Sequence, residues 1–203
     1  ALTTGDANVI IGHNAGQTLT TSGFNTLIGK SAGANIAAGQ TDANGTVAVG
    51  WEALLDLTEG RYSTAIGYGA GHNVSTADYS TFVGYEAGKG NDSTPLTGNA
   101  NTAVGYRAGY SLEAAGSNNT LLGAHAGINV TTGLKNIAIG YGALYTNVDG
   151  DDNIAIGRYS LYNYEADGDG EGQNIAIGTD AGEWCTTGEN NTFVGTRAAQ
   201  GIT

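Results

Sequence analysis

One short pattern of polar and apolar positions recurs along the whole chain. It consists of a polar residue, three mostly apolar residues, a glycine, two variable residues and then Ala-Gly, as in 101–109 and 63–71. Successive central glycines are 17 residues apart in most units, 18 in one unit and 21 in three units. The eleven central glycines are Gly12, Gly29, Gly50, Gly67, Gly84, Gly105, Gly123, Gly140, Gly157, Gly178 and Gly195.

The positions around the central glycine form columns. Four residues before it stands Asn in eight units, with Thr46, Ser63 and Ser80 in the others. The residue directly before it is always Ile, Val or Leu, and the third residue after it is Ala in ten units and Ser160 in the eleventh. Columns kept in register over eleven units indicate a repeat protein, in which each unit stacks on its neighbours.

The length of the unit predicts the fold. Seventeen residues cannot hold the helix pairs of the common helical repeats, which need more than about 30. The β-branched run that ends at each glycine favours a strand, and the Asn- and Thr-Gly-rich stretches favour turns. We therefore predict an all-β, parallel β-solenoid of eleven coils of 17–21 residues, forming a single repeat domain over 1–203 with enlarged loops at 35–46, 89–101 and 162–174.

Alternation along the strands predicts a surface for assembly. The residues one and three before each glycine share one face, which we expect to point into the coil. The residue two before the glycine is apolar in every unit, and we expect this column to be the interface between chains of a homotrimer. The alternative is that it packs inside its own coil. The column contains Ile10, Leu27, Ala48, Ala65, Phe82, Ala103, Leu121, Ala138, Ala155, Ala176 and Phe193.

Charge and composition remove several classes of function. The formal net charge of −12 makes nucleic acid an unfavourable partner. No run of about 18 apolar residues occurs, so membrane insertion is not expected. The single cysteine, Cys185, excludes an intrachain disulfide. No recurring pair of carboxylates suggests glycoside cleavage, so we expect no catalytic residues and no enzymatic activity.

One acidic run is a candidate calcium site. Asp167, Asp169 and Glu171 alternate with glycines, and carboxylate oxygens are the ligands that calcium prefers. The alternative is a solvated acidic loop, and no other cofactor is expected.

An aromatic column directly follows the central glycine in several units. Trp51, Tyr68, Tyr85, Tyr106 and Tyr141 occupy it. Stacked aromatic rings can contact glycans or brace neighbouring coils, and bracing is the favoured interpretation. An ice-binding surface would need a regular ladder of threonines along the rod. Thr-Thr pairs occur in only some coils, so ice binding is less favoured than bracing or glycan contact.

The motif resembles known surface proteins. The stretch 101–109 and the Thr-Thr-Gly-x-x-Asn pattern within 186–195 resemble the head repeats of trimeric autotransporter adhesins of the YadA type, and equally the repeat arrays of phage-type tail fibres. The resemblance covers the whole chain, although these coils are longer than the usual adhesin coil. It implies a left-handed β-roll in a trimer that binds matrix proteins or surfaces.

The function that we expect is therefore a structural or adhesive extracellular fibre segment on a cell or virion surface. The alternative is a phage tail fibre or tailspike that binds, and less readily cleaves, cell-surface carbohydrate. The expected partners are other copies of the chain, surface glycans and matrix proteins. Joining residue 203 to residue 1 would place Gly12 20 residues after Gly195, within the spacing of the repeat. We therefore expect either a longer tandem array, which is slightly favoured, or end-to-end stacking of separate copies into a filament.

Overall fold

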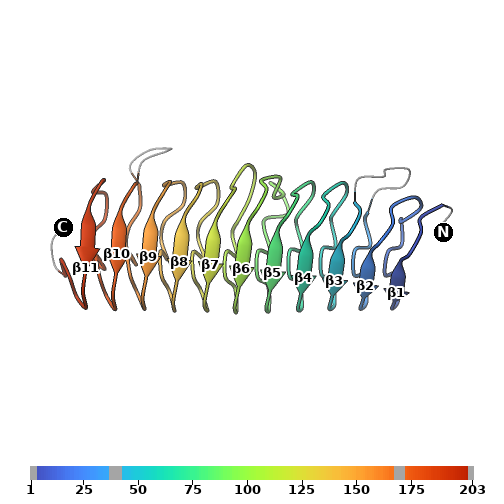
Figure 1. Ribbon diagram of the computed structural model, residues 1–203, viewed down its shortest axis with the longest axis horizontal. Coiled ribbons are helices and arrows are strands. Elements are labelled where there is room, and N and C mark those ends of the chain that lie inside the picture. Colours follow the sequence, from blue (N-terminus) through green and yellow to red (C-terminus); the bar gives the residue numbers. More distant parts are fainter. Residues whose placement is uncertain (1–3, 37–42, 167–171, 201–203) are drawn as a thin grey trace.

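The computed structural model describes residues 4–36, 43–166 and 172–200, and within them the protein is an all-β solenoid (Figure 1). All eleven strands form one parallel sheet in which they follow chain order. The strands are β1 (Val9–Ile11), β2 (Thr26–Ile28), β3 (Val47–Val49), β4 (Thr64–Ile66), β5 (Thr81–Val83), β6 (Thr102–Val104), β7 (Thr120–Leu122), β8 (Ile137–Ile139), β9 (Ile154–Ile156), β10 (Ile175–Ile177) and β11 (Thr192–Val194).

Each predicted unit supplies one strand, which ends at the residue before the central glycine. Neighbouring strands pair position for position, as Thr102, Ala103 and Val104 of β6 pair with the equivalent residues of β7. The sequence columns are therefore real columns that run along the rod, and the prediction of a parallel β-solenoid is confirmed.

The central glycines hold the coils close together. All eleven have φ between 119° and 136°, a region that side chains with a Cβ rarely adopt. In the first ten, a Cβ would lie 2.3–2.7 Å from the carbonyl oxygen of the central glycine in the next coil. Any other residue in this column would therefore push two coils apart.

The polar column four residues before the glycine is buried and bonded from coil to coil. In Asn136, the backbone N–H donates to Asn119 Oδ1 at 3.0 Å. The Asn136 side chain donates to the same oxygen at 3.3 Å and to the Gly150 carbonyl at 2.8 Å. Asn153 then donates its N–H to Asn136 Oδ1 at 3.0 Å. This asparagine ladder satisfies strand and turn backbone that no water reaches.

The expected direction of the two strand faces is wrong. The residues two before the glycine point into the coil, and the residues one and three before it point outward. Of the column predicted as the interface, the nine members from Leu27 to Ala176 are fully buried within the single chain: Leu27, Ala48, Ala65, Phe82, Ala103, Leu121, Ala138, Ala155 and Ala176. Ile10 and Phe193 are more open because they lie in the first and last strands.

The physical reason is that each coil has an opposite wall that needs these side chains as partners. A second buried column stands seven residues after the central glycine, for example Leu57, Val74 and Leu112. Small residues between the walls leave room for the larger side chains: a Cβ at Gly88 would lie 2.0 Å from the Phe82 ring. Packing within the chain's own coil, the alternative interpretation of this column, is what the structure has.

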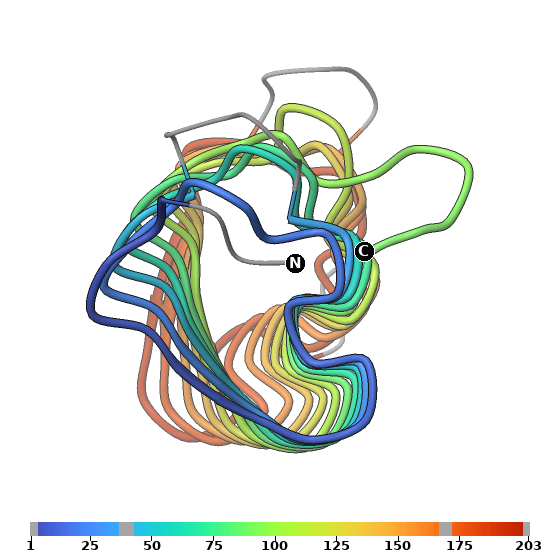
Figure 2. The same cartoon turned by 90° about the vertical axis from the view of Figure 1, so that its right-hand side faces the viewer.

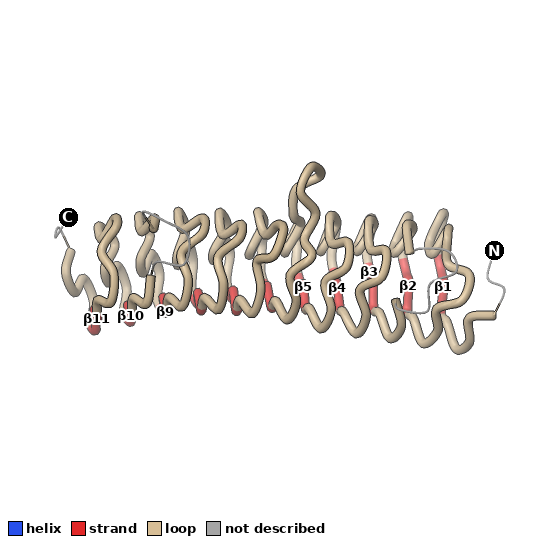
Figure 3. Tube along the Cα trace, turned by 90° about the horizontal axis from the view of Figure 1, so that it is seen from above, coloured by secondary structure: helices blue, strands red, loops and turns tan. Residues whose placement is uncertain are grey.

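One enlarged loop projects clearly from the rod. After Gly90 the chain leaves the coil and returns at Leu96, which forms isolated bridges to Val74 and Ala114 in the coils on either side. Figures 2 and 3 show this projection on the side of the solenoid away from the strands. Parts of the other two predicted loops, 37–42 and 167–171, lie outside the described residues.

Candidate functional site

The outer sheet face consists of the two outward-pointing columns of the eleven strands. The column one before the glycine contains only Ile, Val and Leu, while the column three before it has Thr in six strands and Val or Ile in five. Exposed examples are Ile66 at 41% and Val104 at 36%. The face contains no charged residue, although the chain has seven basic and nineteen acidic residues. The column one before the glycine is therefore a continuous apolar strip beside a column rich in threonine, and an apolar strip of this length is unusual on an isolated soluble chain.

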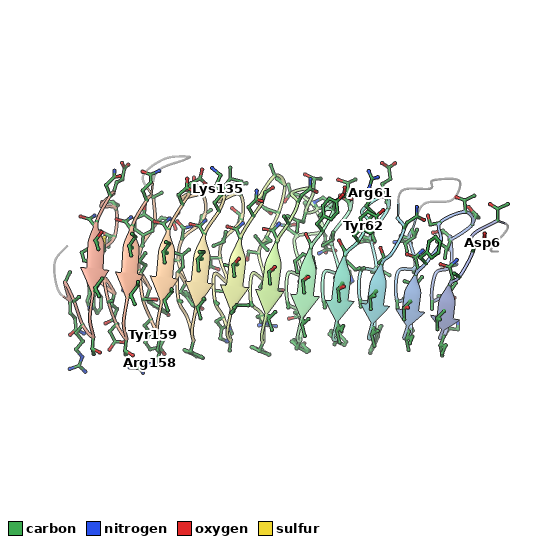
Figure 4. All side chains as sticks on the ribbon, in the orientation of Figure 1. Asp6, Arg61, Tyr62, Lys135, Arg158 and Tyr159 are labelled. Atoms are coloured by element: carbon green, nitrogen blue, oxygen red, sulfur yellow. The ribbon has the colours of Figure 1, made fainter. Side chains whose placement is uncertain are left out.

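Aromatic side chains border this face at both edges. Figure 4 shows Tyr159 and Arg158 at the edge where the strands end, and Tyr62 at the opposite edge. Tyr62 stacks on Tyr79 of the next coil, with ring centroids 5.5 Å apart. Both rims of the outer sheet face therefore carry rings that contact rings of neighbouring coils.

The predicted aromatic column forms a continuous ladder at the edge where the strands end. Tyr68 stacks on Tyr85 at 5.2 Å, and Tyr85 stacks on Tyr106 at 5.4 Å. Trp51 meets Tyr68 edge to face at 5.3 Å. These neighbours lie within the range in which aromatic pairs attract one another.

A histidine continues the ladder where the sequence column has a gap. His125 lies 5.1 Å from Tyr106 and 5.8 Å from Tyr141, both in edge-to-face geometry. His125 stands two residues after its glycine instead of one, so the column analysis missed it. In this unit Ala124 occupies the column position and the aromatic ring follows one residue later. That ring was the signal in the sequence that could have identified His125.

The geometry of the ladder favours bracing over glycan stacking. Tyr68 and Tyr85 are stacked with their planes at 8°, so one face of each ring is turned toward the other ring. At the free side of Trp51, Lys30 Nζ lies 4.8 Å above the ring. Because a sugar needs an open ring face, this part of the ladder is poorly suited to bind one.

A cleft of about 380 Å³ lies between the projecting loop and the coils that follow it. It is lined by Lys89, Gly90, Asn91, Asp92, Tyr110, Ser111, Glu113 and Thr131. This volume falls within the usual range of small-molecule sites, about 300–1,000 Å³. The cleft is the second surface of the molecule, after the outer sheet face, with the form of a binding site.

A charged network closes one side of this cleft. Lys89 Nζ lies 3.3 Å from the Tyr110 hydroxyl and 3.4 Å from Glu86 Oε1. Partial burial lowers the pKa of Lys89, but the hydrogen bond to Tyr110 and the charge of Glu86 outweigh it and raise that pKa. Arg107 Nε donates to the other oxygen of Glu86 at 2.8 Å. Lys89 is therefore a fixed, protonated donor.

The candidate calcium residues Asp167, Asp169 and Glu171 lie outside the described residues. In 4–36, 43–166 and 172–200, no group of three or more His, Cys, Asp or Glu side chains is placed to hold a metal ion. The same ranges contain no helix long and apolar enough to cross a membrane.

Cys185 belongs to the core. It stands seven residues after its central glycine, in the column that holds Leu57 and Val74, and it is buried. Burial raises the pKa of its thiol, which disfavours the reactive thiolate. Cys185 is therefore placed as a packing residue.

Comparison of the chain with protein-family models, with curated proteins and with solved structures finds no match.

Proposed function

We propose that the chain is a structural and adhesive segment of an extracellular fibre, in which three parallel copies associate through their outer sheet faces. The observation that carries this proposal is the uncharged, β-branched strip along all eleven strands. Burial of apolar surface contributes about 25 cal/mol per Å², so a partner along the whole strip gives a large favourable term.

Charge supports a second copy as the occupant of this face. Each chain has a formal net charge of −12, so two copies repel each other over most of their surface. The outer sheet face contains no charged residue, so contact there keeps the like charges of two copies farther apart than contact elsewhere. Because the same side-chain pattern recurs at every strand, each coil of one copy finds equivalent contacts along the other.

The number of copies and the location are proposed from the resemblance to adhesin heads and tail fibres. In those arrays three chains surround a common axis at a cell or virion surface. The left-handed sense expected from the same resemblance agrees with Figure 2, where the chain runs counter-clockwise as it recedes from its N-terminal end. A rigid rod of this kind acts as a spacer that presents its exposed loops for attachment.

Native mass spectrometry and light scattering test the assembly. We expect the wild-type chain of 20.4 kDa to give a particle of three chains. Val104→Glu, in the centre of the outer sheet face, should give single chains because it places charges in a dry interface. Val148→Glu is the matched control, since Val148 has the same side chain and 37% exposure but lies outside the strands.

Two results would contradict the assembly. One is a wild-type chain that stays monomeric at micromolar concentration. The other is an unchanged particle mass in Val104→Glu with the fold intact by circular dichroism.

A further inference from the structure

The cleft beside residues 90–95 exists only because of the loop insertion. Gly84 and Gly105 are 21 residues apart, four more than the basic repeat, and the extension contributes Gly90, Asn91 and Asp92 to the lining. The opposite wall comes from the next coils through Tyr110, Ser111, Glu113 and Thr131.

The loop is held in place at both ends. Gly90 N–H donates to the Tyr110 carbonyl at 3.0 Å, and Leu96 N–H donates to the Asn73 carbonyl at 3.0 Å. The buried Asn73 amide donates to the Gly90 carbonyl at 3.1 Å and to Asp92 Oδ1 at 2.8 Å. These bonds form the cleft before any ligand arrives, which lowers the entropy cost of binding.

A further bond joins the tip of the loop to the opposite wall. Thr94 Oγ1 donates to Glu113 Oε2, while the loop tip is closed by the Ser93 N–H bond to Asn91 Oδ1 at 2.9 Å. The two carboxylates of the lining, Asp92 and Glu113, are thus each oriented by one neighbour through one of their two oxygens.

The chemistry of the lining selects the class of ligand. The carboxylates of Asp92 and Glu113 accept hydrogen bonds, and the ammonium of Lys89 donates them. The side chains of Asn91, Ser111 and Thr131 can both donate and accept. An apolar ligand would leave these groups unpaired at a cost. With two acids and one base the lining has a net charge of −1, which disfavours phosphates, sulfates and uronic acids. The protonated Lys89 disfavours a metal cation.

We infer that this cleft binds one neutral saccharide unit, such as a hexose or an N-acetylhexosamine at a chain end. A compact ligand with a hydroxyl on nearly every carbon matches alternating donors and acceptors around a cavity of this volume. The inference deepens the proposed attachment function by assigning its contact with surface glycans. Since the loop projects away from the strands, covering the outer sheet face leaves the cleft open (Figures 2 and 3).

Saturation-transfer difference NMR on the full chain tests the inference. The probes are the methyl glycosides of glucose, galactose, mannose and N-acetylglucosamine, with methyl glucuronide as the anionic comparison. We expect at least one neutral glycoside to bind and the glucuronide to bind at least tenfold more weakly. Deletion of residues 91–94, which restores the 17-residue spacing, should abolish binding.

A second variant guards against misfolding of the deletion. Glu113→Ala should weaken binding about tenfold, the usual effect of losing a hydrogen bond to a charged group. Glu59→Ala, an exposed acid on a coil without the inserted loop, should leave binding unchanged. The inference is overturned if no neutral glycoside binds, if both cleft variants bind like wild type, or if the glucuronide binds best.

Parallel mass measurements separate this inference from the proposed assembly. Val104→Glu should lose the trimer and keep glycoside binding in the cleft. Glu113→Ala should keep the trimer and bind the glycoside about tenfold more weakly. If only the particle masses differ from these expectations, the proposed assembly is wrong. If only the glycoside binding differs, the inferred saccharide site is wrong.

Discussion

The buried polar column behaves differently in two regions of the same rod. From Asn101 to Asn191 every coil contributes an asparagine, and the side-chain amides of Asn119, Asn136, Asn153, Asn174 and Asn191 each donate to the oxygen of the asparagine before. Between Asn25 and Asn101 the column contains Thr46, Ser63 and Ser80 instead. The shorter side chains reach fewer partners, although the strand ladder continues without interruption.

The bonds in the Ser/Thr region are fewer and longer. Ser63 Oγ donates to the Ala77 carbonyl at 3.2 Å and accepts the Ser80 N–H at 3.2 Å. At the start of the region, the buried Asn25 Nδ2 and Thr46 Oγ1 have no hydrogen-bond partner. Buried polar atoms in this state cost about 1–3 kcal/mol each.

Aromatic ring contacts run through both regions, since the ladder continues through Tyr106, His125 and Tyr141 in units that contain asparagine. The Trp51–Tyr68–Tyr85 series follows the strands of the units that contain Thr46, Ser63 and Ser80. The Tyr62–Tyr79 pair also belongs to this region. The comparison indicates that the two regions share the ring contacts outside the coil and differ in the polar bonds inside it, while the strand ladder stays the same.

The largest effect is expected from removing one ladder asparagine. Asn136→Ala removes one of the two bonds to the Gly150 carbonyl and leaves both Asn153 donors without their Asn136 partner, which should lower the free energy of unfolding by about 3 kcal/mol. The equivalent change Ser63→Ala should cost about 1 kcal/mol, because Ser63 Oγ makes only weak bonds, to the Arg61 and Ala77 carbonyls and from the Ser80 N–H. Chemical denaturation measures both, and equal losses would contradict the difference between the regions.

The next effect concerns the rings. Tyr68→Ala removes contacts to Trp51 and Tyr85, each worth about 0.5–1.5 kcal/mol, so a loss of about 2 kcal/mol is expected. Phe24→Ala is the control: Phe24 is exposed and forms no ring contact with the other described residues. Its removal should change stability by less than about 0.5 kcal/mol. A Tyr68→Ala protein as stable as the control would show that the ladder does not brace the coils.

The smallest effect is a gain. Thr46→Asn extends the asparagine ladder, because the new amide can donate to Asn25 Oδ1, as Asn136 does to Asn119, and to the Gly60 carbonyl, in the position that Gly150 has for Asn136. It also removes the buried Thr46 Oγ1, which has no hydrogen-bond partner. We expect about 1 kcal/mol of added stability, seen as a higher midpoint of thermal unfolding. Thr196→Asn, on the exposed surface of the last described coil, should change nothing. A lower midpoint for Thr46→Asn would mean that the coil has no room for the longer side chain.

The sequence predicted the repeat, the strands and the register of the asparagine column, because each depends on residues at a fixed position in every unit. Strand alternation distinguished two faces but did not say which one points inward. The threonines three before the glycine, such as Thr64 and Thr102, were the available sign of an outward column. This sign was overlooked because the Ala, Phe and Leu residues of the other column fit an interface between chains as well as they fit a core.

The cleft was beyond sequence analysis for a different reason. Its shape depends on contacts between residues far apart in the chain, such as Asn73 with Asp92 and Thr94 with Glu113. The repeat analysis located the insertion at 89–101 but had no means to fold it. The backbone of Arg107 and His125, with φ of 53° and 59°, was equally hidden, because neither residue type signals a left-handed bend.

The direction of the strand hydrogen bonds has a mechanical consequence. All eleven strands lie across the rod, so the bonds between them point along its length. Tension applied between the ends therefore loads these bonds a few at a time, and the rod should lengthen by peeling coils from an end. Each released coil of 17 residues adds roughly 56–61 Å of extended chain, and each coil of 21 residues roughly 69–76 Å. In an optical trap the repeat would appear as a staircase of nearly equal steps, with the longer steps marking the inserted loops.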